Sequence, residues 1–211
     1  MNFLFDCFSG GVIFEVRNES EAELAEKAGA VAVLLEYSFS PLSPEGDSQN
    51  LTKILNKIDI PVLSAFHPGH LVEAELLCQM GIWGIYADSR IEQISLNYNF
   101  SKIMAEGIAV LADIDLKNIK NNNFAPVLRG ETLNDIVQGL KIFKKHQFKF
   151  VAGPIKTVSD VALLKRFHAD AVIIPYSVFE VSSSVKYLSK LVKASFYFDN
   201  MNKLAALLSS E

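Results

Sequence analysis

Polar and charged side chains follow nearly every short apolar run of the chain, and their types could bind or transform a small polar molecule. The set is Arg17 and Asn18, Glu36, His67 and His70, Asp88, Asp113 and Asp115, Arg129 and Glu131, Lys156, and Tyr176. A guanidinium group pairs with phosphate or carboxylate, and a deprotonated lysine amine can attack a carbonyl to form an imine. Anion binding and carbonyl chemistry are therefore the activities that these residues could support.

A metal site is a weaker interpretation of the same residues. Glu36, His67, Asp88 and Asp113 could in principle hold a divalent ion, but their spacing matches no recognised ligand motif. We favour solvated carboxylates and expect no metal. His70 more simply caps the helix that follows it than takes part in catalysis.

Lys156 and Arg129 each allow more than one interpretation, whereas Tyr176 has only a simple one. Lys156 could bind an anion or replace a missing imine-forming lysine, and a solvated surface lysine is the simpler alternative. Arg129 could bind an anion, and it could equally pair with Glu131 or with another carboxylate at the strand ends. Tyr176 could fill a pocket at the end of the last predicted strand.

The elements that must position these residues alternate regularly along the chain. Short β-rich apolar runs, separated by amphipathic segments, predict parallel strands with crossover helices. The predicted strands are 11–16, 30–36, 61–66, 84–88, 108–114, 125–129, 148–153 and 171–176. The predicted helices are 18–29, 51–58, 70–80, 116–123, 132–146, 157–169, 185–196 and 201–209, with a less clear helical segment at 91–107.

Eight such strands predict a closed (β/α)8 TIM barrel, because an open doubly wound sheet usually has fewer. We expect one domain over residues 1–211. No glycine-rich Rossmann fingerprint and no P-loop occurs in the sequence. Residues 37–50 read as a long Ser/Pro/Gly loop that could close over a ligand.

Composition excludes several classes of partner. The chain has 211 residues, half of them hydrophobic, and a formal net charge of −4 with its basic residues scattered, so neither nucleic acid nor a membrane is expected to bind. No apolar run approaches the roughly 18 residues that span a bilayer. Two cysteines are too few for a disulfide framework, which favours a cytoplasmic protein, and Cys78 is expected to be a buried structural thiol.

Several blocks of residues carry a resemblance to a known family. They are 10–13 with Val16 and Asn18, 25–33, 60–63, 69–70 with 72–74, 80–81, 150–153 with Thr157, 160–163, 169–172, and 198–199 with 203–205. Through them nearly the whole chain is similar to the PdxS/SNZ family, the synthase subunit of pyridoxal 5'-phosphate synthase. The resemblance implies a barrel that condenses ribose 5-phosphate, glyceraldehyde 3-phosphate and ammonia, using a lysine of strand three that forms an imine with the pentose.

The chain departs from the family where that chemistry resides. Ala65 aligns with the imine-forming lysine, and a methyl group cannot form an imine. A second functional lysine of the family, just after strand six, is also absent, although Arg129 and its neighbours Gly130 and Glu131 remain. Glu15 stands where the family has the aspartate that contacts the pentose.

The family's phosphate site is altered as well. It uses glycine N–H groups after strands seven and eight; here Gly153 remains, but Pro154 follows it, and Pro175 and Tyr176 replace a Gly-Ser pair. Proline has no N–H to donate, so a backbone anion site is incomplete there. The residues that could still bind substrate or an anion are Glu15, Arg129, Gly153 and Lys156; we assign no catalytic residue and no cofactor.

Two functions follow from these departures. The first is a non-catalytic relative that regulates or scaffolds, either in a ring with an active synthase paralogue or by self-assembly into a ring. The second is an active barrel lyase or synthase that acts on a small sugar-phosphate-like substrate with substituted catalytic groups. The segment before the first strand is shorter than the family's, which counts against docking of the glutaminase partner that supplies ammonia.

Overall fold

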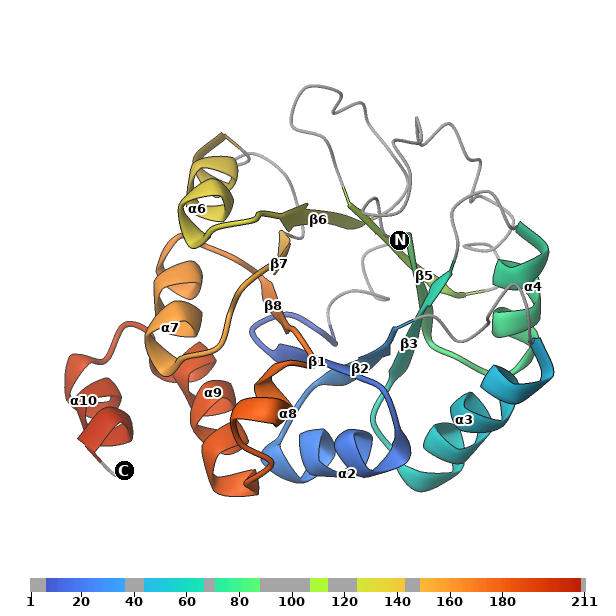
Figure 1. Ribbon diagram of the computed structural model, residues 1–211. Coiled ribbons are helices and arrows are strands. Elements are labelled where there is room, and N and C mark those ends of the chain that lie inside the picture. The colour runs from blue at the N-terminus through green and yellow to red at the C-terminus, as the bar shows by residue number, and fades with distance from the viewer. Residues whose placement is uncertain are drawn as a thin grey trace.

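Eight parallel strands form a closed barrel in a computed structural model of the protein (Figure 1), which describes residues 7–36, 44–66, 71–87, 107–113, 125–142 and 149–209. Each strand pairs with the next along the chain, and β8 pairs with β1 to close the barrel. The predicted (β/α)8 architecture is confirmed. The strands are β1 Val12–Val16, β2 Ala32–Leu35, β3 Val62–Phe66, β4 Gly84–Ala87, β5 Ala109–Asp113, β6 Ala125–Arg129, β7 Phe150–Ala152 and β8 Ala171–Ile174.

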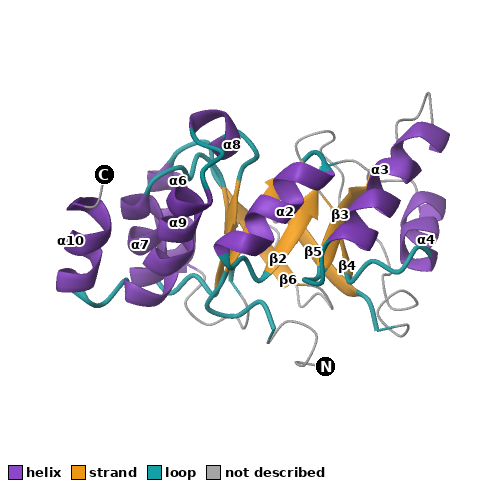
Figure 2. Cartoon of the chain, turned by 90° about the horizontal axis from the view of Figure 1, so that it is seen from below, coloured by secondary structure: helices purple, strands orange, loops and turns teal. Residues whose placement is uncertain are grey.

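Helices surround the barrel on its outside, as Figure 2 shows from a second direction. They are α2 Glu19–Ala28, α3 Pro44–Lys57, α4 Leu71–Gln79, α6 Leu133–Ile142, α7 Val158–Arg166, α8 Val178–Val181, α9 Val185–Tyr197 and α10 Met201–Ser209. The helix α2 begins at the N-cap Asn18, whose side chain accepts a hydrogen bond from the Glu21 N–H.

The expectation of a loop over 37–50 is wrong in its second half, because α3 already begins at Pro44. Proline suits the first helical turn, where its missing N–H costs no hydrogen bond. The short helix α8 was not predicted, since four residues carry no helical periodicity. The predicted helix 116–123 and all but the last residue of 91–107 lie outside the described residues.

The core has two layers, because successive side chains of a strand point to opposite faces. Val12 and Phe14 pack outward against the helices, whereas Ile13 belongs to the cluster inside the barrel. Ala65 and Tyr86 lie in the inner cluster too. Glu15, two residues beyond Ile13, therefore lies on the inner face of β1 at the carboxyl end of the barrel.

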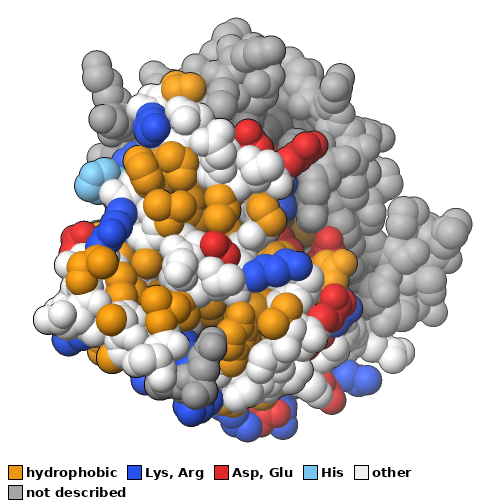
Figure 3. All heavy atoms as spheres, turned by 60° about the vertical axis from the view of Figure 1, so that its left-hand side comes forward, with side chains coloured by type: hydrophobic (Ala, Val, Ile, Leu, Met, Phe, Trp, Pro, Cys, Tyr) orange, Lys and Arg blue, Asp and Glu red, His pale blue; other side chains and the backbone are white. Residues whose placement is uncertain are grey.

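One side of the molecule exposes large apolar side chains. Figure 3 shows them gathered on the face that carries α10 and α7. The exposed apolar residues of the helices α6, α7, α9 and α10 are Ile142, Leu163, Phe196, Met201 and Leu208. Within α10 only Leu204 is buried, so most of this helix lies at the surface.

Candidate active site

Four polar side chains from four strands meet inside the carboxyl end of the barrel. Glu15 lies on β1, Tyr86 on β4, Asp113 on β5 and Arg129 on β6. The first three are 3%, 1% and 2% exposed, and the Arg129 side chain is 17% exposed. The catalytic centres of (β/α)8 enzymes occupy this end of the barrel.

Arg129 is held by the other three residues. Its Nη2 donates to the Tyr86 hydroxyl at 2.6 Å, and its Nε donates to Asp113 Oδ2 at 3.1 Å. The Tyr86 hydroxyl in turn donates to Asp113 Oδ1, and Arg129 Nη2 reaches Glu15 Oε1 at 3.5 Å. Arg129 thus pairs with carboxylates of the barrel interior, one of the two alternatives that the sequence left open.

Ala65 lies next to this network. It is 2% exposed on β3, and its backbone is in register with that of Tyr86 on β4. Both side chains belong to the inner cluster. The position where the resemblance leads us to expect an imine-forming lysine is therefore a packed, apolar part of the barrel wall.

A cavity of about 580 Å³ opens above the network. It brings together all four binding candidates from the sequence, Glu15, Arg129, Gly153 and Lys156. Ala65 is not part of the described lining. The remaining lining residues are Asp113, Gly130, Glu131, Pro154, Pro175, Tyr176 and Ser177.

Gly153 has a packing reason to be glycine. A Cβ atom there would lie 2.7 Å from the carbonyl oxygen of Gly130 and 2.8 Å from Cδ1 of Ile136. Those distances are shorter than van der Waals contact, so only glycine fits without a shift of the neighbouring turn. The retention of Gly153 is therefore explained without a bound phosphate.

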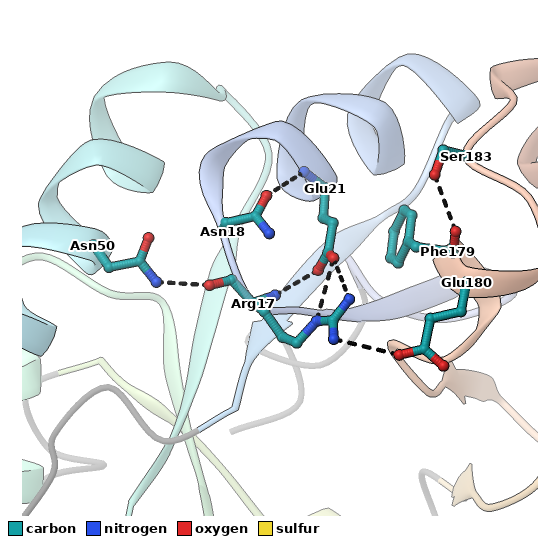
Figure 4. A network of polar contacts seen from close by, with 7 residues as sticks. All are labelled: Arg17, Asn18, Glu21, Asn50, Phe179, Glu180 and Ser183. Carbon is teal, nitrogen blue, oxygen red and sulfur yellow. Dashed lines mark hydrogen bonds and ion pairs between the residues drawn. The ribbon is translucent and has the colours of Figure 1, made fainter.

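Arg17 lies at the centre of a network of polar contacts (Figure 4). Its guanidinium donates to Glu21 at 2.8 and 3.2 Å and reaches Glu180 at 3.4 Å. The hydrogen bond to Glu21 raises the pKa of Arg17 above its ordinary value, so the group stays charged. The guanidinium carbon lies 4.6 Å from the centre of the Tyr176 ring, a cation–π contact. The network joins β1, α2 and α8 and holds Tyr176 in the cavity wall.

The other polar candidates are not brought into this site by the described structure. Glu36 directly follows β2 and is half-buried, whereas His67, His70, Asp88 and Asp115 lie outside the described residues. Within the described ranges no group of three or more His, Cys, Asp or Glu side chains could hold a metal ion. Cys78 is half-buried and packs against the outer core.

Sequence reasoning missed Tyr86. It lies inside an apolar strand, where a tyrosine is usually assigned to the core, and its hydroxyl meets Asp113 and Arg129 only after the barrel closes. A buried tyrosine needs a partner for its hydroxyl, and this is the one signal that the sequence contained.

None of the helices in the described part of the chain is long and apolar enough to cross a membrane.

Comparison with known proteins agrees with this architecture. Residues 2–92 match the model of the SOR/SNZ family. The "Pyridoxal 5'-phosphate synthase subunit PdxS" of Dictyoglomus turgidum is 26% identical over 97% of this chain and 86% of its own length. The "Pyridoxal 5'-phosphate synthase subunit SNZ1" of Saccharomyces cerevisiae is 23% identical over 98% of this chain and 87% of its own length.

Among solved structures, 3-hexulose-6-phosphate synthase from Salmonella typhimurium superposes with a TM-score of 0.70 at 12% identity. The match covers 89% of this chain and 99% of that one, and at this identity it speaks for the shared barrel fold alone. Residues 2–92 of this chain thus resemble the SOR/SNZ family, and nearly the whole sequence is similar to PdxS and SNZ subunits of pyridoxal 5'-phosphate synthase.

Proposed function

We propose that this protein is a non-catalytic relative of the synthase subunit in vitamin B6 (pyridoxal 5'-phosphate) biosynthesis, with a regulatory or scaffolding role in the cytoplasm. One observation carries the proposal: the position of the imine-forming lysine is Ala65, buried in the barrel wall beside Tyr86. Without an amine at this point, a pentose carbonyl has no nucleophile on β3 to attack it.

The surrounding contacts support the proposal. Arg129, the cation closest to the family's second lysine in sequence, is engaged by Tyr86, Asp113 and Glu15. Pro154 and Pro175 line the cavity where the family has N–H donors for phosphate. Each change weakens a different part of the synthase reaction. Neighbouring groups could compensate for one substitution, but they would have to compensate for several changes at once to restore the reaction.

The alternative is an active enzyme with substituted groups, and Lys156 is the residue that favours it. Lys156 lines the same cavity as Glu15 and Glu131. A lysine amine there could form an imine with a sugar-phosphate-like substrate that enters from the rim. Such an enzyme would use a lysine that follows β7, four strands away from β3 in the closed barrel.

Imine trapping separates the two functions. We expect no mass increase when the purified protein is incubated with ribose 5-phosphate, reduced with borohydride and weighed intact; a complete PdxS subunit treated in parallel is the positive control. A stable pentose adduct would overturn the non-catalytic proposal. If Lys156→Met then abolished that adduct while Lys149→Met, outside the cavity, retained it, the alternative would be established.

Assembly is the second part of the proposal. We propose that the chain joins a ring with an active synthase paralogue or assembles with itself, without the glutaminase partner. The exposed apolar side chains of α7, α9 and α10 support a protein partner, because contiguous apolar surface on a soluble barrel commonly marks an interface.

A further inference from the structure

Arg166 connects the end of α7 to the start of α10. It is the last residue of α7, and Met201 is the first residue of α10. Nε of Arg166 donates to the Phe198 carbonyl oxygen at 2.8 Å, and Nη2 donates to Sδ of Met201 at 2.8 Å. The hydrogen bond to the backbone at Phe198 therefore holds the guanidinium group against the thioether of Met201.

Met201 is also open to solvent. It is 63% exposed, whereas Met80, the other methionine among the described residues, is half-buried and packs against the outer core. The helix α10, which carries Met201, buries only Leu204. An oxidant dissolved in water can thus reach the Met201 side chain without any unfolding of the helix.

A thioether reacts with a hydroperoxide in one two-electron step. A sulfur lone pair attacks one peroxide oxygen, and the S–O bond forms as the O–O bond breaks. The second oxygen takes the proton of the first and leaves as water or an alcohol. Sulfur is oxidised to the sulfoxide and the peroxide is reduced. Negative charge develops on the leaving oxygen before the proton arrives, so a nearby N–H donor stabilises the transition state.

The Arg166 guanidinium is placed to be this donor. It carries more N–H groups than the two that bond Phe198 and Met201, and hydrogen bonds from a charged donor are stronger than neutral ones. A thioether sulfur is only a weak acceptor, whereas a sulfoxide oxygen is a strong one. The same cation therefore stabilises the oxidised product as well.

We propose that Met201 is a site of oxidation by hydroperoxides and that Arg166 makes it reactive. The inference goes beyond the proposed function and does not depend on it. Leu163, Phe196 and Leu208 lie on the same outer helices as Met201 and form exposed apolar surface with it. Oxidation adds a polar S–O group to this surface, and sulfoxide reductases can remove it again. A partner that binds through this surface would distinguish the reduced chain from the oxidised one.

Peptide mass spectrometry after timed exposure to hydrogen peroxide tests the proposal. We expect the Met201 sulfoxide to form at least about tenfold faster than the Met80 sulfoxide in the folded protein, because Met80 is packed against the core. In a chain unfolded by urea the two rates should become equal, because neither Arg166 nor the core then distinguishes the two sulfur atoms.

Variants of Arg166 separate its effect from that of exposure. Arg166→Gln and Arg166→Leu both remove the cation, and each is expected to slow Met201 oxidation by about threefold, the size of an exposed charge interaction. The shorter side chains also uncover the sulfur, so a slower rate cannot come from lost access. Lys203→Gln, which removes a positive charge from the exposed surface of α10, is the control and should leave the rate unchanged. Circular dichroism confirms that each variant is folded.

The inference is overturned if Met201 of the folded protein is oxidised no faster than Met80, if the folded Arg166 variants keep the full rate, or if Lys203→Gln slows the reaction equally. None of these results bears on imine trapping, which reports on a lysine amine. A pentose adduct, conversely, would overturn the non-catalytic proposal and leave the methionine oxidation rates as they are.

Discussion

Tyr86 connects the two halves of the polar network at the centre of the barrel. Its hydroxyl accepts hydrogen bonds from Arg129 Nη2 and Nε and donates to Asp113. The residue is 1% exposed, so water cannot easily replace these partners. Removing the hydroxyl leaves a guanidinium and a carboxylate short of one partner each in a buried place.

Tyr86→Phe is therefore expected to lower the free energy of unfolding by about 2 kcal/mol, measured by urea denaturation. Tyr187→Phe is the matched control: its hydroxyl donates to the Lys156 carbonyl at 2.7 Å at a partly exposed position, and its loss should cost about 0.5 kcal/mol. Equal losses in the two variants would show that the buried network adds nothing beyond an ordinary hydrogen bond.

At the scale of elements, the turns after β6 and β7 approach closely enough to shape the cavity wall. The Gly130 N–H donates to the Ala152 carbonyl at 3.2 Å, and Gly153 follows with no space for a Cβ atom. Cδ1 of Ile136, from α6, would lie 2.8 Å from a Cβ atom at Gly153. The wall that holds Arg129, Gly130 and Gly153 is thus set by contact between two turns and a helix.

Gly153→Ala should destabilise the protein by about 2 kcal/mol, because its methyl group would overlap with the Gly130 carbonyl oxygen. Gly81→Ala is the control. Gly81 has φ +90°, and a Cβ atom at this position would have no other atom within 4 Å, so the substitution causes backbone strain of about 1 kcal/mol without steric overlap. The free energies of unfolding of the two variants are compared by urea denaturation. If Gly153→Ala were no more destabilising than Gly81→Ala, the close approach of the turns would not explain this glycine.

At the scale of the whole molecule, closure of the barrel leaves none of the eight described strands with a free edge for pairing with another chain. The outer helices carry the exposed apolar residues Leu163, Phe196, Met201 and Leu208. The helix α10 contributes two of these four and buries only Leu204. Exposed apolar surface of this kind often marks an interface, which is the basis for testing the proposed assembly.

If the chain assembles with itself, we expect sedimentation at micromolar concentration to show a species larger than the 23.4 kDa monomer. If it joins a ring with an active paralogue, we expect a tagged complete synthase subunit of the same organism to retain this chain on co-expression. An unrelated tagged barrel serves as the control for non-specific capture. A monomer that never co-purifies with the synthase subunit would eliminate both forms of the assembly proposal.

The alternation of strands and helices could be predicted from the sequence because it depends on local periodicity. The strands β1 to β8 all lie within their predicted ranges, with ends that differ by at most a few residues. Glu15, Arg129, Gly153 and Lys156 could be placed at one end of the barrel, because the carboxyl ends of parallel strands meet there. The start of α3 at Pro44 and the short helix α8 could not, since neither segment has a clear apolar period.

The sequence by itself determined the closed barrel and the absence of an amine at Ala65. Only the tertiary structure decided which carboxylates Arg129 meets, that Tyr86 joins them, and that Gly153 serves packing. The reason is distance along the chain. The four polar residues of the site belong to four different strands, Glu15 on β1, Tyr86 on β4, Asp113 on β5 and Arg129 on β6. A local sequence pattern does not predict which of these side chains contact one another in the barrel interior. Their partnership exists only when the eight strands close and water is excluded from the space between them.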